Sequence, residues 1–143
     1  MIKSYKRYTF VDTSAWYALF DKDDNNHIQA NVFYENNIFP LMTTDYILDE
    51  SITLIKKRLG HTKAVEIGKS LWNRELADLI HLTEDDKATA WKIFQRYDDK
   101  GFSFTDCTTF AIMDRLNIPT VFAFDVHFKQ YPRLKSLPGE FYL

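Results

Sequence analysis

The chain has 143 residues, 45% of them hydrophobic, which predicts a single domain over residues 1–143 with a full core of its own. Its 18 Lys and Arg against 20 Asp and Glu give a formal net charge of −2, which excludes a protein that holds nucleic acid by bulk charge alone. The single cysteine, Cys107, excludes an intrachain disulfide, and since no apolar run approaches the roughly 18 residues of a membrane helix, we expect a cytoplasmic protein with no membrane partner.

The N-terminal half of the chain alternates between strand and helix patterns. Short runs of aromatic and β-branched residues predict buried strands, and apolar residues spaced three and four apart predict helices. The hydroxyls of Thr13 and Ser14 are expected to cap the first helix. Thr44 is expected to cap the third helix, and Gly60 to end it. In chain order the predicted elements cover residues 8–11, 15–20, 26–36, 40–43 and 44–59.

The C-terminal half continues this alternation. Val65, Leu71 and Trp72 mark the apolar side of a predicted helix. Helices are predicted over residues 61–74, 83–97 and 103–116, and strands over residues 79–82, 120–124 and 141–143. Strands that alternate with helices imply right-handed crossovers and parallel pairing. We therefore predict an α/β fold, a three-layer α/β/α domain with a mostly parallel central sheet of four to five strands.

The glycines exclude several common nucleotide sites. They stand at positions 60, 68, 101 and 139, so the chain has no Gly-x-Gly pair. Dinucleotide-binding and Walker-type phosphate loops need closely spaced glycines, and both are therefore excluded. No His-Glu-x-x-His zinc helix and no Gly-x-Ser-x-Gly nucleophile elbow occurs either.

Two aspartates directly follow predicted strands. Asp12 ends the first strand and Asp125 ends the strand over residues 120–124. In an open parallel sheet the ligand site lies beyond the carboxyl ends of the strands, so two carboxylates there would face one crevice. Either residue could instead be a turn residue or a helix cap.

Two further acidic residues stand near predicted helix starts. Asp106 follows Ser103 in the Ser-x-x-Asp pattern of a capping box, but it shares a helical stripe with Phe110. Glu50 stands where the helix dipole favours an acid, but it lies beside an apolar stripe. Each residue is therefore either a local stabiliser of its helix or a partly buried carboxylate that needs a partner.

Taken together, the four acidic residues point to a metal site. Carboxylates that converge repel one another and raise each other's pKa. A divalent cation removes that repulsion, and ligands that are all oxygen favour Mg²⁺ or Mn²⁺ over zinc. Such a cation activates water and stabilises charge on a phosphate. The residues alone therefore predict metal-dependent phosphodiester hydrolysis.

At this point the sequence resembles a known family. Four segments, in order and over nearly the whole chain, look like the acidic motifs of PIN domains and are most similar to those of the VapC toxins of type II toxin–antitoxin systems: Phe10-Val11-Asp12-Thr13-Ser14-Ala15-Trp16, Leu48-Asp49-Glu50-Ser51, Phe104-Thr105-Asp106-Cys107 and Phe124-Asp125-Val126-His127-Phe128. The resemblance departs from the family at Ala123, where many relatives carry a Thr or Ser.

The resemblance implies an endoribonuclease that holds Mg²⁺ or Mn²⁺ with Asp12, Glu50, Asp106 and Asp125. The first and third of these would bind the metal most directly, and Thr13 and Thr105 would support the acidic cluster. The resemblance further implies an RNA substrate, a homodimer, and a cognate VapB-like antitoxin whose tail covers the active site.

Other interpretations of single residues stay open. His127 could orient a carboxylate, lie on the surface or act as a general base. Trp16, Tyr17 and Phe20 could stack on bases, but their helical spacing with Leu19 fits a core or a dimer interface better. A receiver-like signalling domain would need adjacent acids after the first strand, which Asp12 lacks. A catalytically silent PIN-like binding module is the main alternative to the nuclease.

Overall fold

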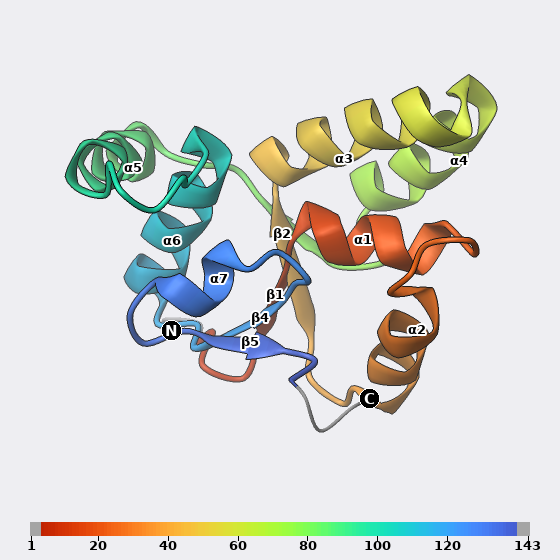
Figure 1. Cartoon of the computed structure of the whole chain (residues 1–143), viewed down its shortest axis with the longest axis horizontal. Coiled ribbons are helices and arrows are strands. Elements are labelled where there is room, and N and C mark those ends of the chain that lie inside the picture. The colour runs from red at the N-terminus through yellow and green to blue at the C-terminus, as the bar shows by residue number, and fades with distance from the viewer. Residues whose placement is uncertain (1–3, 140–143) are drawn as a thin grey trace.

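Five short strands alternate with seven helices in the computed structural model, which describes residues 4–139 (Figure 1). The strands are β1 (Thr9–Val11), β2 (Leu41–Thr44), β3 (Asp78–Ile80), β4 (Thr120–Phe122) and β5 (Lys135–Leu137). The helices are α1 (Thr13–Phe20), α2 (His27–Asn36), α3 (Asp45–Leu59), α4 (His61–Trp72), α5 (Glu84–Arg96), α6 (Phe104–Leu116) and α7 (His127–Gln130). No helix among these described residues is long and apolar enough to cross a membrane.

The strands form one parallel sheet in the order β3-β2-β1-β4-β5. The chain moves outward from β1 through β2 to β3 and then returns to β4 on the other side of β1. Right-handed crossovers therefore place α1 to α4 on one face of the sheet and α5 to α7 on the other, as Figure 1 shows. This arrangement confirms the predicted three-layer fold. The order of connections reverses between β1 and β4, which is where such sheets bind ligands.

Large apolar side chains fill the space between the layers. The biggest fully buried ones are Trp16, Phe10, Phe110, Phe122, Phe128 and Met42. Helix α6 is enclosed most completely, since every residue from position 106 to position 113 is buried. Trp16 and Tyr17 belong to this core, so they are not available for base stacking. The rigid packing of α6 fixes the position of its first turn.

The start of α1 differs from the sequence prediction. The helix begins at Thr13 and not near Ala15, and its cap is the carboxylate of Asp12 and not a hydroxyl. Asp12 immediately precedes the helix, so its side chain reaches the amide of Ser14, the second helical residue, at 3.0 Å. Asp12, a candidate site residue, thus also stabilises the N-terminus of α1.

The apolar side predicted for α4 is partly wrong. Val65 and Trp72 are 54% and 63% exposed, whereas Ala64 and Gly68 face the protein. A Cβ atom at Gly68 would lie 3.0 Å from the Ile52 side chain of α3. Small residues on this side let the two helices pack closely, which turns the larger side chains toward solvent.

The last strand of the described residues was not predicted. Strand β5 covers Lys135–Leu137 and pairs with β4 through Thr120↔Lys135 and Phe122↔Leu137. Its three residues are too few and too polar to predict a strand from sequence. Helix α7 was not predicted either. The strand predicted over residues 141–143 falls outside the described residues.

Candidate metal centre

A cavity of about 410 Å³ at the carboxyl edge of the sheet brings the four predicted carboxylates together. They come from four places in the chain: the junction of β1 and α1, helix α3, the first turn of α6, and the segment between β4 and α7. The lining residues are Asp12, Thr13, Ser14, Glu50, Leu54, Ser103, Asp106 and Asp125. No lysine or arginine is among them, so the carboxylates face one another without a protein cation in the cavity wall.

Ser14 ties Asp12 to the end of β4. Its backbone amide and its hydroxyl donate to Oδ2 of Asp12, at 3.0 and 2.6 Å. The Ser14 hydroxyl oxygen also accepts a hydrogen bond from the backbone amide of Phe124 at 3.0 Å. A hydroxyl thus stands between the two strand ends although Ala123 carries none. The sequence had suggested only a capping role for Ser14, and the repeated hydroxyls after Asp12 were the available signal.

Asp106 closes the capping box that its sequence pattern predicts. Its backbone amide donates to the Ser103 hydroxyl and its Oδ2 accepts from the Ser103 amide, both at 3.0 Å. The capping interpretation and the site interpretation are therefore not alternatives. The same carboxylate is buried and lines the cavity.

His127 bridges two of the carboxylates. Its Nδ1 lies 2.9 Å from Oδ2 of Asp106 and 3.2 Å from Oδ1 of Asp125. Its backbone amide also donates to Oδ1 of Asp125 at 2.9 Å. A hydrogen on Nδ1 would therefore hold the two carboxylates toward one another. These contacts agree with one of the interpretations that the sequence left open for His127, that it orients a carboxylate.

The same three residues have the geometry of a cation site. Asp106, Asp125 and His127 each offer one ligand atom, and these atoms lie within 4.8 Å of one another. Two of the three ligands are carboxylates, which suits a hard divalent ion.

Glu50 approaches the cavity from α3. Thr13 also lines the cavity and lowers the pKa of Glu50, and its hydroxyl accepts a hydrogen bond from Ser51 at 3.2 Å. Thr105 does not line the cavity, and its backbone carbonyl accepts from the Thr108 hydroxyl at 2.6 Å. Of the two predicted supporting threonines, Thr13 is thus the one in contact with the acidic cluster.

Burial and mutual repulsion oppose ionisation of the cluster. Burial is the largest cause of the raised pKa of Asp12, the charges of Asp106 and Glu50 add to it, and the pKa reaches about 7 although the Ser14 hydrogen bonds oppose this. Burial also raises the pKa of Glu50 and of Asp106, and the charge of Asp125 adds to both effects. A bound cation would stabilise the ionised carboxylates and remove their mutual repulsion. The donor set of the cavity therefore fits a divalent metal ion.

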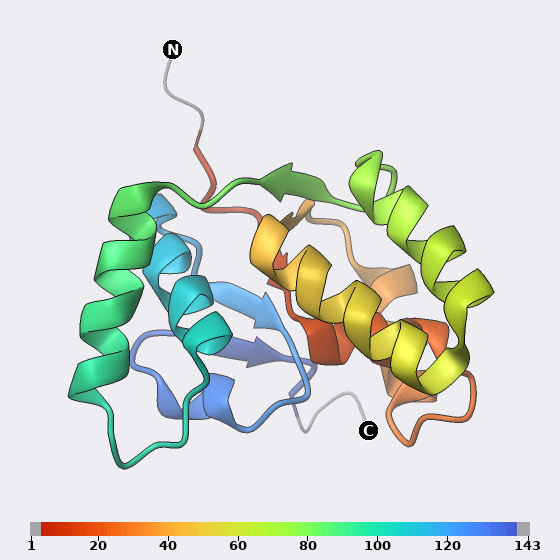
Figure 2. The same ribbon diagram turned by 90° about the horizontal axis from the view of Figure 1, so that it is seen from above.

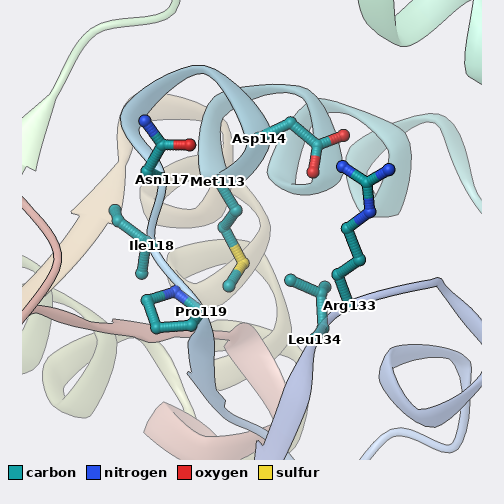
Figure 3. A pocket seen from close by; sticks show the side chains of 7 residues that line it. All are labelled: Met113, Asp114, Asn117, Ile118, Pro119, Arg133 and Leu134. Atoms are coloured by element: carbon teal, nitrogen blue, oxygen red, sulfur yellow. The ribbon is translucent and has the colours of Figure 1, made fainter.

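A second cavity, of about 340 Å³, lies at the opposite edge of the sheet (Figure 3). Apolar and charged side chains from the end of α6 and from the starts of β4 and β5 line it: Met113, Asp114, Asn117, Ile118, Pro119, Arg133 and Leu134. Open parallel sheets bind their ligands at the carboxyl edge, and this cavity faces the amino edge. The carboxylate cavity is therefore the candidate site.

Comparison with known proteins identifies the family of the chain. The family model described as the PIN domain matches residues 9–134. The chain is 34% identical over 119 residues to the 23S rRNA-specific endonuclease VapC20 of Mycobacterium tuberculosis, covering 83% of this chain and 90% of that protein. It is 25% identical over 117 residues to a VapC ribonuclease of Archaeoglobus fulgidus, covering 78% and 73%.

Solved structures of VapC proteins share the fold of this chain. The crystal structure of Mycobacterium tuberculosis VapC20, a Sarcin-Ricin loop cleaving toxin, superposes with a TM-score of 0.83 at 32% identity, covering 88% of this chain and 96% of that chain. VapBC2 from Rickettsia felis, bound to a promoter DNA fragment, superposes with a TM-score of 0.65 at 13% identity, covering 90% and 96%. The second likeness is one of fold alone.

Proposed function

The chain belongs to the PIN-domain family, and from that membership we propose that it is a metal-dependent endoribonuclease, the toxin of a toxin–antitoxin pair. The observation that carries the proposal is the cavity itself, in which four carboxylates meet and no lysine or arginine takes part in the lining. A binding surface for the RNA backbone would present positive charge directly. A cavity whose charged lining residues are all acidic instead requires a cation between the protein and the phosphate.

Asp12, Glu50, Asp106 and Asp125 would hold Mg²⁺ or Mn²⁺. Oxygen ligands at a half-open cavity suit these ions, which in turn supply an activated water and a counter-charge for the phosphate. Asp12 and Asp106 are the most buried of the four, so they would be the principal ligands. The hydrogen bonds from Ser14 and His127 orient these two carboxylates before any metal arrives.

Thr13 would support Glu50 from the cavity wall, where it favours the ionised form of that carboxyl. Thr105 would act less directly, because it stands in the first turn of α6 beside Asp106 but outside the cavity lining. Removing either hydroxyl should therefore cost less activity than removing a carboxylate, and removing Thr13 should cost more than removing Thr105.

The choice of substrate follows from the named relative. VapC20 is described as a 23S rRNA-specific endonuclease that cleaves the Sarcin-Ricin loop. The chain covers 90% of that protein at 34% identity, so we propose a structured ribosomal RNA loop as its substrate class. A VapB-like antitoxin, a homodimeric state and a cytoplasmic location complete the proposal, and the crystallised VapBC complexes of this fold support the first of these.

The decisive test compares cleavage of a labelled 23S rRNA loop fragment in Mn²⁺ and in EDTA. We expect the wild-type chain to cut only with metal, and Asp12→Asn to lose at least about a hundredfold in rate. Asp23→Asn is the matched control, because Asp23 is exposed and lies outside the cavity.

Three other outcomes would change the conclusion. Metal binding without cleavage of rRNA, tRNA or mRNA would mean that the substrate class is wrong. Equal cutting by wild type and Asp12→Asn would place the activity outside this cavity. A chain that neither binds metal nor cuts RNA would be a silent binding module.

A further inference from the structure

Two large aromatic rings are exposed side by side on α5. Trp91 and Phe94 are 53% and 39% exposed, and their ring centroids lie 5.8 Å apart with planes inclined by only 18°. Lys87 stands one helical turn before Trp91, so the three side chains share one stripe of the helix. An exposed aromatic pair with an adjacent cation marks an interaction site and not a stability feature.

A third ring links this pair to the segment that lines the carboxylate cavity. The Phe104 ring lies 6.5 Å from that of Trp91, 6.2 Å from that of Phe94 and 6.4 Å from that of Tyr46. We call these four residues the aromatic surface. Phe104 directly follows Ser103, which lines the cavity.

Tyr46 provides the second connection to the cavity. It precedes Glu50 by one turn of α3, about 6 Å along the helix axis. The aromatic surface therefore begins beside two of the four carboxylates, on both α3 and α6. A strand held at the cavity would reach the surface with a neighbouring nucleotide.

We infer that the aromatic surface binds an unpaired nucleobase of the RNA strand whose scissile phosphate lies at the carboxylate cavity. The inference rests on the proposed function. Aromatic rings stack on the face of any base, and a base is free to stack only when it has left its duplex. The surface would therefore select loops and single-stranded segments without reading their sequence.

Charge supports a nucleotide as the occupant. The Lys87 ammonium lies 5.7 Å from the Tyr46 ring centroid, at the end of the surface nearest α3. Its partner in the structure is Glu84, 3.4 Å away and with a side chain 92% exposed, a pairing that water and salt weaken. Lys87 is thus free to meet a phosphate next to the stacked base.

A second copy of the chain fits this surface less well. Charged residues are depleted from the centres of stable homodimer interfaces. On α5, Lys87 and Glu84 stand four and seven residues before Trp91, so two charged side chains share the stripe of the aromatic rings. A nucleotide needs only one or two rings and a cation, which is what the surface offers.

Tryptophan fluorescence provides a direct test. The chain has three tryptophans, of which Trp16 is 1% exposed, while Trp72 is exposed on α4, across the molecule from α5 (Figure 2). In a Trp72→Phe chain, Trp91 is the only exposed tryptophan. With Asp12→Asn added to block cleavage and Mg²⁺ present, we expect a 12-nucleotide oligouridylate to quench its emission. The same oligonucleotide paired with oligoadenylate should not.

Affinity for the same oligouridylate provides the second readout. We expect Trp91→Ala to weaken binding roughly tenfold, Trp91→Phe to restore most of it, and the control Trp72→Ala to change nothing. Equal affinity of Trp91→Ala and Trp72→Ala, or equal quenching by single strand and duplex, would overturn the inference. So would loss of a dimer in Trp91→Ala with unchanged RNA affinity, because a second copy would then cover the surface.

These readouts are independent of cleavage. A chain that cuts no RNA but whose Trp91 responds to oligouridylate would refute the proposed nuclease and retain the base-binding surface. A chain that cuts RNA with an intact rate and affinity in Trp91→Ala would do the reverse.

Discussion

Helices α5 and α6 begin in the same way but use their first turns differently. In α5, Thr83 and Asp86 form a capping box, and in α6, Ser103 and Asp106 form another. Both aspartates are buried, 2% and 7% exposed. The local sequence pattern, the geometry and the burial are therefore nearly the same at the two positions.

The difference lies in what each carboxylate meets across the protein. Arg115 donates to both oxygens of Asp86, at 2.6 and 3.0 Å. Burial opposes ionisation there, but the hydrogen bonds from Arg115 and Thr83 outweigh it and lower the pKa of Asp86. Asp106 meets Asp125 and a single imidazole nitrogen, and its pKa is raised. Asp86 thus has a permanent cation beside it, and Asp106, which we propose as a metal ligand, lacks one.

The largest predicted effect concerns the pH dependence of stability without metal. Burial raises the pKa of Asp12 from 3.8 to about 7, so the folded chain binds a proton that the unfolded chain releases. This contribution is fully present below pH 3.8 and is lost as the pH rises toward 7. We expect the free energy of unfolding in EDTA to fall by on the order of 4 kcal/mol across that interval.

Urea unfolding at pH 5 and pH 8 measures the upper part of this change, about 3 kcal/mol. Asp12→Asn should lose the slope, and Mg²⁺ should restore stability at pH 8 in the wild type only. The lowered pKa of Asp86 acts in the opposite sense, because its contribution disappears as the pH falls below 3.8. A metal-free chain that gains stability between pH 5 and pH 8 would contradict the prediction.

The second prediction compares the same substitution, Asp→Asn, in the two capping boxes. Asp106→Asn should reduce the rate of metal-dependent cleavage at least about a hundredfold and leave the free energy of unfolding in EDTA unchanged or higher, since it removes a repelled charge. Asp86→Asn should cost about 1–3 kcal/mol of stability, because it deprives Arg115 of its partner, and leave the rate per folded molecule within about twofold. The half-exposed guanidinium can turn to water, which limits this loss.

Cleavage rates and urea unfolding of Asp106→Asn and Asp86→Asn test this difference between the two capping boxes. If both variants lost activity equally, or if Asp106→Asn were the less stable one, the two boxes would not differ in function.

The sequence was enough to predict α1 to α6, β1 to β4 and the four carboxylates, because strand ends, caps and helical stripes are local patterns. Asp12, Asp106 and Asp125 stand at such local landmarks, and the structure brings all three to one cavity. The contact between His127 and Asp106 joins residues 21 positions apart, and the one between Arg115 and Asp86 joins residues 29 apart. Packing alone decides those contacts, so the sequence could not distinguish the two capping boxes.

The smallest predicted effect concerns His127. It contacts the capping-box carboxylate of Asp106, as Arg115 contacts that of Asp86. Its Nδ1 serves two carboxylates at 2.9 and 3.2 Å, so it positions ligands without neutralising both charges. His127→Ala should weaken Mn²⁺ binding about tenfold, because Asp106 and Asp125 would then turn apart. The change in the free energy of unfolding in EDTA should stay within about 1 kcal/mol, since one hydrogen bond is lost.

Electron paramagnetic resonance of free Mn²⁺ measures this binding without reference to cleavage. An asparagine amide can lie where Nδ1 lies, so His127→Asn should recover most of the affinity, whereas a longer glutamine should not. Tighter Mn²⁺ binding in His127→Ala would mean that the imidazole competes with the metal for the carboxylates. In that case His127 would resemble Arg115, a resident cation that stabilises the empty site.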